Sequence, residues 1–92
     1  MVYLIEYSPE AFGQLSRMPG KTSAEIVDRI SRRLSRNPTQ AEGVREKLSD
    51  NAEQERPVWL LQVGRYLVAF GVDEDRRRIL VQSIAKIERS RP

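Results

Sequence analysis

Two segments of the 92-residue chain constrain its fold more than any other part of the sequence. Residues 3–11, Tyr-Leu-Ile-Glu-Tyr-Ser-Pro-Glu-Ala, are typical of a strand that runs directly into a helix. Residues 58–68, Val-Trp-Leu-Leu-Gln-Val-Gly-Arg-Tyr-Leu-Val, are typical of two strands that meet at a glycine-containing turn. A chain with a strand at its start, helices next and a strand pair after its middle is expected to be a mixed α+β domain.

The first strand and helix have clear local signals. Residues 2–7 alternate in the manner of a strand, with β-branched and aromatic residues that suit a pleated surface. Ser8 is placed to cap the helix and Pro9 suits its first position. Pro19-Gly20 is expected to stop this helix. Its apolar stripe is formed by Ala11, Leu15 and Met18.

A second helix is predicted to start at a capping box, with Thr22 as N-cap and Glu25 at the third position. Asn37-Pro38 ends it, because the residue before a proline is disfavoured in helical conformation. The short link between the helices predicts an antiparallel hairpin. The apolar face is expected to hold Ile26, Val27, Ile30 and Leu34. The charged face holds Asp28, Arg29, Arg32, Arg33 and Arg36.

The second half of the chain predicts strands. Residues 44–48 alternate and suit a short edge strand, whereas residues 49–57 are polar without a period and are interpreted as a loop. Residues 58–63 and 66–72 are apolar on both faces, as buried central strands tend to be. A third strand is predicted over residues 78–84 after a polar turn. In it, one face is expected to hold Ile79, Val81 and Ser83, and the other Leu80, Gln82 and Ile84.

The order of elements predicts the fold class. Three C-terminal strands joined by short turns are expected to be antiparallel neighbours. The helical hairpin has one apolar face to bury, and a sheet face is available to bury it. Residues 1–92 are therefore predicted to form a single two-layer α+β domain. Its N-terminal strand precedes a helical hairpin that packs on a mainly antiparallel sheet of four to five strands.

Composition excludes several kinds of site. The chain has no cysteine, which rules out disulfides, thiolate metal ligands and cysteine nucleophiles, and no histidine, the commonest general base near neutral pH. No run is long and apolar enough to span a bilayer, and no signal peptide is expected, so a cytoplasmic protein with no membrane partner is predicted. Neither a metal nor a small-molecule cofactor is expected. Catalysis would rest on Arg, Lys, Tyr, Ser or carboxylate side chains.

The positive charge lies mainly in the C-terminal part. Residues 1–55 carry eight Lys and Arg against nine Asp and Glu, whereas residues 56–92 carry eight against four. This asymmetry fits either a phosphate-binding surface or a solvated strand face with scattered arginines. The basic residues in question are Arg45, Lys47, Arg65, Arg76, Arg77, Arg78, Lys86, Arg89 and Arg91.

Two further sets of side chains leave alternatives open. Trp59, Tyr66 and Phe70 are of a type that stacks on bases, although their strand spacing favours positions in the core. The arginines of the second helix suit a contact with DNA, or ion pairs with Asp28, Glu25 or an acidic segment of a partner. The triple arginine at residues 76–78 is interpreted as a solvated hairpin end.

The chain resembles the RelE/ParE superfamily over nearly its whole length. The resemblance rests on Tyr7-Ser8-Pro9-Glu10-Ala11, Leu15…Pro19, Ile30…Leu34…Asn37-Pro38, Val63-Gly64-Arg65-Tyr66 and Ser83-Ile84-Ala85-Lys86-Ile87-Glu88-Arg89. It implies a toxin of a type II toxin–antitoxin module, neutralised by a cognate antitoxin. RelE-like members cut mRNA on the ribosome without a metal, and ParE-like members poison DNA gyrase.

The family's catalytic basic residues are not matched position by position. They would align with Leu60, Gln62, Leu67 and Ile87, none of which is charged. The resemblance therefore implies a rearranged basic site, with Arg65, Lys86 and Arg89 as catalytic residues. The residues expected to bind nucleic acid are Arg45, Lys47, Gln62 and Arg91.

Three functions follow from the resemblance. The first is ribosome-dependent mRNA cleavage by the rearranged site. The second is inhibition of DNA gyrase without nuclease activity, and the third is a catalytically degenerate, antitoxin-binding role. The apolar Leu60, Leu67 and Ile87 either complete the core or form a patch that a partner covers.

Overall fold

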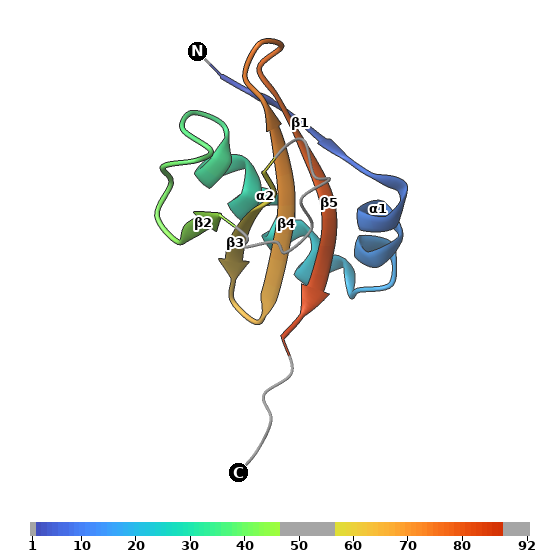
Figure 1. The fold of residues 1–92 in the computed structure, drawn as a ribbon. Coiled ribbons are helices and arrows are strands. Elements are labelled where there is room, and N and C mark those ends of the chain that lie inside the picture. Colours follow the sequence, from blue (N-terminus) through green and yellow to red (C-terminus); the bar gives the residue numbers. More distant parts are fainter. Residues whose placement is uncertain (1, 47–56, 88–92) are drawn as a thin grey trace.

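The computed structural model describes residues 2–46 and 57–87. The expectations for Lys47, Arg89, Arg91 and residues 49–56 lie outside these ranges. These residues form two helices and a sheet of five strands, and Figure 1 shows how the elements are arranged. The elements are β1 (Leu4–Tyr7), α1 (Pro9–Ser16), α2 (Gly20–Leu34), β2 (Val44–Glu46), β3 (Trp59–Val63), β4 (Tyr66–Asp73) and β5 (Arg78–Lys86).

The five strands form one sheet in the order β1-β5-β4-β3-β2. The pairs β2–β3, β3–β4 and β4–β5 are antiparallel, and β1 pairs with β5 in parallel. The predicted α+β architecture, with its mainly antiparallel sheet, is therefore confirmed. The short edge strand is confirmed as β2, within the part of residues 44–48 that the structure describes.

The start of α1 follows the sequence prediction. Ser8 is the N-cap, and its Oγ accepts a hydrogen bond of 3.1 Å from the backbone N–H of Ala11. The same hydroxyl donates to the backbone carbonyl of Gln82 at 2.8 Å. Farther along the helix, Gln14 Oε1 accepts from the backbone N–H of Ile84 at 2.5 Å. Two polar side chains thus fasten α1 to the part of β5 that lies beyond its pairing with β1.

The register of β5 changes next to these two contacts. Ala69 of β4 faces Ser83, whereas the next residue, Phe70, faces Val81, so that Gln82 is an extra residue in β5. A bulge of this kind shifts the alternation of side chains. Ile84 is consequently buried on the same side as Ile79 and Val81, and its predicted place on the opposite face was wrong.

The predicted capping box is also wrong. The second helix begins at Gly20, two residues before Thr22, with Pro19 at the N-cap and no side-chain cap bond. The backbone N–H of Ser23 already bonds to the carbonyl of Pro19 at 3.0 Å. Thr22 and Glu25 therefore lie inside the helix, where their side chains are available for other contacts.

The core lies between the helices and one face of the sheet. Its fully buried members include Phe70 of β4, with Ile30 and Leu34 of α2. Trp59 and Tyr66 pack against this cluster, so the prediction that the aromatic strand residues serve the core is confirmed. Val27 was predicted on the buried face of α2, but it is 37% exposed. None of the described helices is long and apolar enough to cross a membrane.

Candidate functional site

The sheet face opposite the core, which we call the open face, is mostly apolar. Pairing places Arg45, Leu60, Ala69 and Ser83 in one row across the strands, and Gln62, Leu67 and Ala85 in the next. On β3 and β4 their neighbours belong to the core or pack against it, and side chains alternate between the two faces. Arg45 is the one cation in these two rows.

The open face holds the positions that the family resemblance associates with catalysis. Gln62 and Leu67 face one another across β3 and β4. Leu60 lies two residues before Gln62 and therefore on the same face of the sheet. Leu60 and Leu67 are half-buried and do not belong to the core cluster, and Ile87 is 36% exposed. The apolar side chains were expected either to complete the core or to form a surface patch. The structure therefore supports the apolar surface patch.

The predicted nucleic-acid-binding residues that the structure describes are Arg45 and Gln62, and both lie on the open face. The side-chain amide of Gln62 donates to the carbonyl of Gly64 at 3.2 Å, which draws it toward the β3–β4 turn. Arg45 is opposite Leu60. Within these two rows, the described residues offer a nucleic acid the cation of Arg45, the amide of Gln62 and the hydroxyl of Ser83 among apolar side chains.

The predicted catalytic residues that the structure describes, Arg65 and Lys86, lie together in a different place. Both line a pocket of about 340 Å³ at the end of the sheet where β3 turns into β4. We call it the end pocket. Its lining comes from α2, the β3–β4 turn and the end of β5: Thr22, Glu25, Ile26, Arg29, Val63, Gly64, Arg65, Tyr66 and Lys86.

Backbone geometry brings Arg65 and Lys86 together. Gly64 has a φ of +58°, a left-handed conformation that glycine adopts readily, and it allows the tight turn that presents Arg65. The carbonyl of Arg65 accepts a hydrogen bond of 2.6 Å from the N–H of Ile87. Lys86 is paired across the strands with Tyr66, which packs against the core, so its side chain lies on the helix side of the sheet.

The end pocket contains two charged side chains that sequence reasoning did not assign to it. Arg29 adds a third cation to Arg65 and Lys86, and Glu25 adds one carboxylate. Glu25 was interpreted as part of a capping box, and Arg29 as one member of an exposed charged face. Both arguments used only the helix itself, whereas the pocket depends on where the β3–β4 turn packs.

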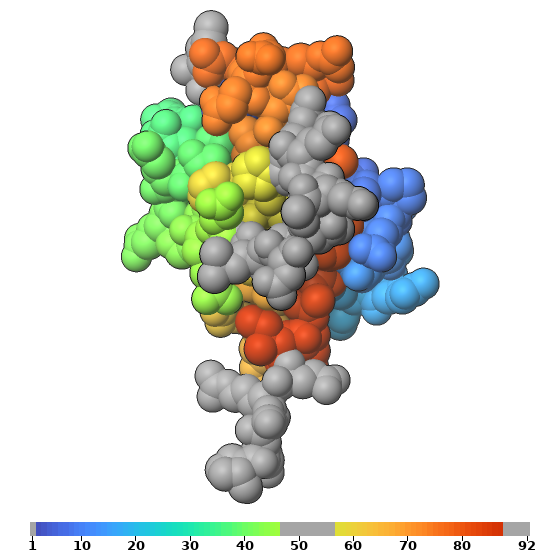
Figure 2. All heavy atoms as spheres, in the orientation of Figure 1, coloured from blue at the N-terminus to red at the C-terminus, as the bar shows by residue number. Residues whose placement is uncertain are grey.

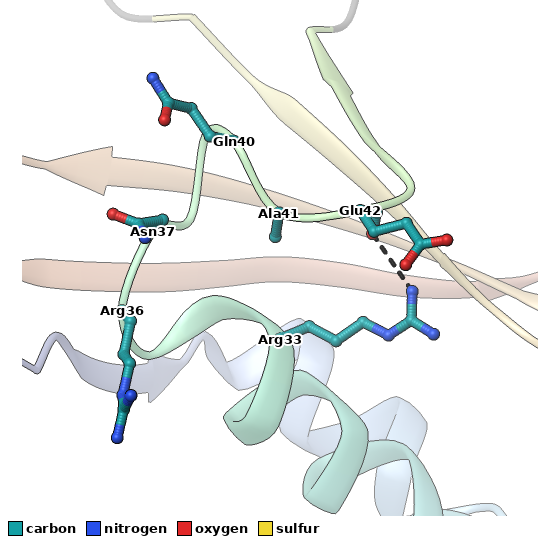
Figure 3. Close-up of a pocket in the computed structure, with 6 residues that line it drawn as sticks. All are labelled: Arg33, Arg36, Asn37, Gln40, Ala41 and Glu42. Carbon is teal, nitrogen blue, oxygen red and sulfur yellow. Dashed lines mark hydrogen bonds between the residues drawn. The ribbon is translucent and has the colours of Figure 1, made fainter.

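A second pocket, which we call the loop pocket, lies between the end of α2 and the segment that leads to β2 (Figure 3). It also measures about 340 Å³. Arg33 extends along the loop, and its Nη1 donates to the carbonyl of Glu42 at 3.1 Å, while Arg36 projects away from that contact. The lining residues are Arg33, Arg36, Asn37, Gln40, Ala41 and Glu42.

The triple arginine at the β4–β5 hairpin end does not form a binding site. This end projects from the top of the molecule in Figure 2. Arg77 has a φ of +52° and stacks over the ring of Tyr3 at 5.8 Å, whereas Arg78 pairs with Glu6 at 3.6 Å. The side chains of Arg77 and Arg78 are thus engaged separately, and all three arginines are exposed, which fits the interpretation as a solvated hairpin end.

Metal binding finds no support in the described ranges. Residues 2–46 and 57–87 contain no group of three or more His, Cys, Asp or Glu side chains that could hold a metal ion.

Comparison with known proteins supports the fold through structure and not through sequence. No protein-family model matches the chain, and no curated protein matches it significantly. Solved structures do. The RelBE2 toxin–antitoxin complex of Mycobacterium tuberculosis matches with a TM-score of 0.76 at 16% identity, over 94% of this chain and 99% of that one.

Two further solved structures agree with this match. The RelE–RelB complex of Pyrococcus horikoshii gives a TM-score of 0.75 at 16% identity, over 98% of this chain and all of that one. The isolated RelE toxin of E. coli gives a TM-score of 0.69 at 17% identity, over 96% of this chain and 87% of that one. The chain therefore has a RelE-like toxin fold, as the sequence resemblance predicted.

Proposed function

We propose that the chain is the toxin of a type II toxin–antitoxin module and that it acts on RNA at the end pocket. The observation that carries the proposal is the convergence of Arg65 and Lys86 on one pocket, where Arg29 joins them. The RelE-like fold supports the assignment to toxins, since the similar structures are RelE toxins, alone or in complexes with antitoxins. By the same likeness, the expected resting partner is a cognate antitoxin.

The end pocket has the groups that metal-independent cleavage of RNA requires. In this reaction the ribose 2′-oxygen forms a bond to phosphorus, and the bond from phosphorus to the 5′-oxygen breaks. Glu25 and Lys86 both line the end pocket. On this proposal Glu25 accepts the proton of the 2′-hydroxyl, and the Lys86 ammonium returns a proton to the leaving oxygen. Arg29 and Arg65 supply donors for the negative charge that develops on the phosphate.

The second candidate function is inhibition without cleavage, either of DNA gyrase or through antitoxin binding alone. It is favoured by the open face, where the family's basic positions are occupied by Leu60, Gln62 and Leu67. An apolar side chain cannot donate a hydrogen bond to a phosphate. On this alternative the open face would be a protein-binding surface, and the end pocket would be without catalytic function.

Inducible expression separates the two candidates. On induction we expect translation arrest with cleaved mRNA, detected by mapping RNA 5′ ends. Because the loss of one charge-stabilising donor lowers a rate by roughly a hundredfold or more, Arg65→Ala/Lys86→Ala is expected to abolish cleavage. The control, Arg17→Ala/Arg76→Ala, removes the same charge from exposed positions outside the end pocket and is expected to cleave normally.

Three results would contradict the proposal. Undiminished cleavage by the double variant would remove the end pocket from the reaction. Arrest of division with an SOS response and intact mRNA would select the gyrase alternative. Normal growth on induction, with the protein present and folded, would select the antitoxin-binding role.

A further inference from the structure

One stripe of arginines on α2 joins the two pockets. Arg29 and Arg33 lie four residues apart on one side of α2, and Arg36 follows directly after the C-cap, Ser35. Arg29 lines the end pocket, whereas Arg33 and Arg36 line the loop pocket. We call these three residues the arginine track.

The track has the length of a short piece of nucleic-acid strand. At a rise of 1.5 Å per residue, Arg29 and Arg33 lie about 6 Å apart along the helix axis, and Arg36 follows beyond the C-cap. Successive phosphates of one stacked strand advance by about 3.4 Å, so about two nucleotide steps correspond to the separation of Arg29 and Arg33. With Arg65 and Lys86 in the end pocket, the surface presents five cations along this path.

The guanidinium groups of the track are available for a ligand. All three arginines are exposed. A guanidinium has five N–H donors, and Arg33 uses one of them in its hydrogen bond to the carbonyl of Glu42. The other donors of Arg33 therefore remain available for a ligand. Arg32, on the neighbouring side of the helix, instead forms an ion pair with Asp28 at 3.1 Å and lines neither pocket.

We propose that the arginine track binds the sugar-phosphate backbone of an RNA strand and leads it into the end pocket. This inference rests on the proposed function and names how its substrate is held. The phosphates would contact the arginines, and the amides of Asn37 and Gln40 in the loop pocket would hydrogen-bond to sugar or phosphate oxygens.

The chemistry of both pockets favours RNA over an acidic peptide. Each pocket places one carboxylate beside its cations, Glu25 in the end pocket and Glu42 in the loop pocket. These carboxylates repel the side chains of an acidic peptide, and they repel phosphates too, so the discrimination rests on the groups beside the anionic ones. An RNA strand instead offers 2′-hydroxyl donors that a carboxylate can accept, next to phosphates for the arginines.

The test is the salt dependence of RNA binding by the purified chain. The probes are a 12-nucleotide single strand and a hairpin of the same composition, because the RNA bound in cells could be either a strand or a structured element. Each single-strand phosphate contact contributes about −0.7 to the slope of log K against log salt. Arg33→Gln/Arg36→Gln is therefore expected to reduce the slope by about 1.4.

Matched variants make the result specific to the track. Lys21→Gln/Arg32→Gln removes two cations from the same helix outside both pockets, and its slope is expected to equal that of the unmodified chain. Arg33→Lys/Arg36→Lys keeps the charges and is expected to restore most of the slope. Thermal unfolding of each variant shows that the fold is intact.

An unchanged slope in Arg33→Gln/Arg36→Gln, or an equal loss in the Lys21/Arg32 control, would overturn the inference. So would tighter binding of a glutamate-rich peptide than of either RNA. These results are separable from a failure of the proposed function, which depends on whether Arg65→Ala/Lys86→Ala still cleaves mRNA in cells. If the end-pocket variant fails to cleave while the track variant binds RNA normally, only the track assignment falls.

Discussion

The contact between Gln14 and β5 gives the most direct test of how the helix layer is held. Gln14 Oε1 accepts the backbone N–H of Ile84 at 2.5 Å, and Ile84 is 2% exposed. Gln14→Leu keeps a similar helix propensity but removes the acceptor. The buried N–H then lacks a partner, which costs about 1–3 kcal/mol of unfolding free energy.

For a domain of this size, a loss of about 2 kcal/mol corresponds to a fall in Tm of roughly 8–16 °C. Thermal and urea unfolding measure this loss, and hydrogen exchange at the Ile84 amide reports on the bond itself. Gln14→Glu, which keeps an oxygen acceptor, is expected to retain most of the stability at neutral pH. Gln40→Leu makes the same change at an exposed position and is expected to alter stability little.

The reasoning would be refuted by two results. One is a Gln14→Leu variant within about 0.5 kcal/mol of the parent, the range typical of surface substitutions. The other is faster exchange at Ile84 in Gln14→Glu than in Gln14→Leu, since the acceptor would then not be the protecting group.

Further predictions concern glycine and tyrosine positions. Gly64→Ala is expected to destabilise by about 1–2 kcal/mol in urea unfolding, because its φ of +58° disfavours a side chain although no atom obstructs one. Gly13→Ala, in the middle of α1 and equally unobstructed, is expected to stabilise by about 0.5–1 kcal/mol, and a loss there would contradict the helix assignment. Burial raises the pKa of Tyr7 above its ordinary value of 10, so ionisation favours the unfolded chain. Stability is therefore expected to fall as the pH rises above about 10, and Tyr7→Phe to fall less between pH 8 and pH 11; an identical loss in both proteins would refute this cause.

Local sequence signals predicted the structure correctly wherever it depends on residues that are neighbours in the chain. Ser8 and Pro9 start α1 as their types predict, and Gly64 forms the β3–β4 turn. In these places the conformational preference of a residue and its short-range hydrogen bonds decide the outcome. The antiparallel order of β3, β4 and β5 then followed from short connections, whereas the places of β1 and β2 in the sheet were not predicted.

Local sequence signals gave wrong predictions where contacts with other parts of the chain decide the local structure. Thr22 has the spacing of an N-cap, yet the carbonyl of Pro19 accepts the first helical bond and the helix begins earlier. The bulge at Gln82 leaves no trace in the apolar pattern, because the two contacts from α1 that accompany it come from the other end of the chain. Ile84 was placed on the wrong face for that reason.

The candidate site was predictable in part. Arg65 and Lys86 were chosen because both lie near the end of the same sheet, and they do line one pocket. Whether they catalyse RNA cleavage remains a prediction. Arg29 and Glu25 could not have been chosen, since their place in the pocket depends on how α2 packs beside the β3–β4 turn.

The parallel pairing of β1 with β5 has a consequence for how the molecule reaches its native state. The contacts that complete the sheet join residues far apart in the chain, and the Ser8–Gln82 hydrogen bond spans 74 positions. Contacts of such long range form late and slow folding, because closing a long loop costs entropy before the contact compensates it. During synthesis β1 and α1 must therefore wait for β5, the last of the described strands to be made. Until then a nascent chain carries its arginine-bearing helix without the sheet end that completes the end pocket, so this pocket is expected to form only once β5 is present.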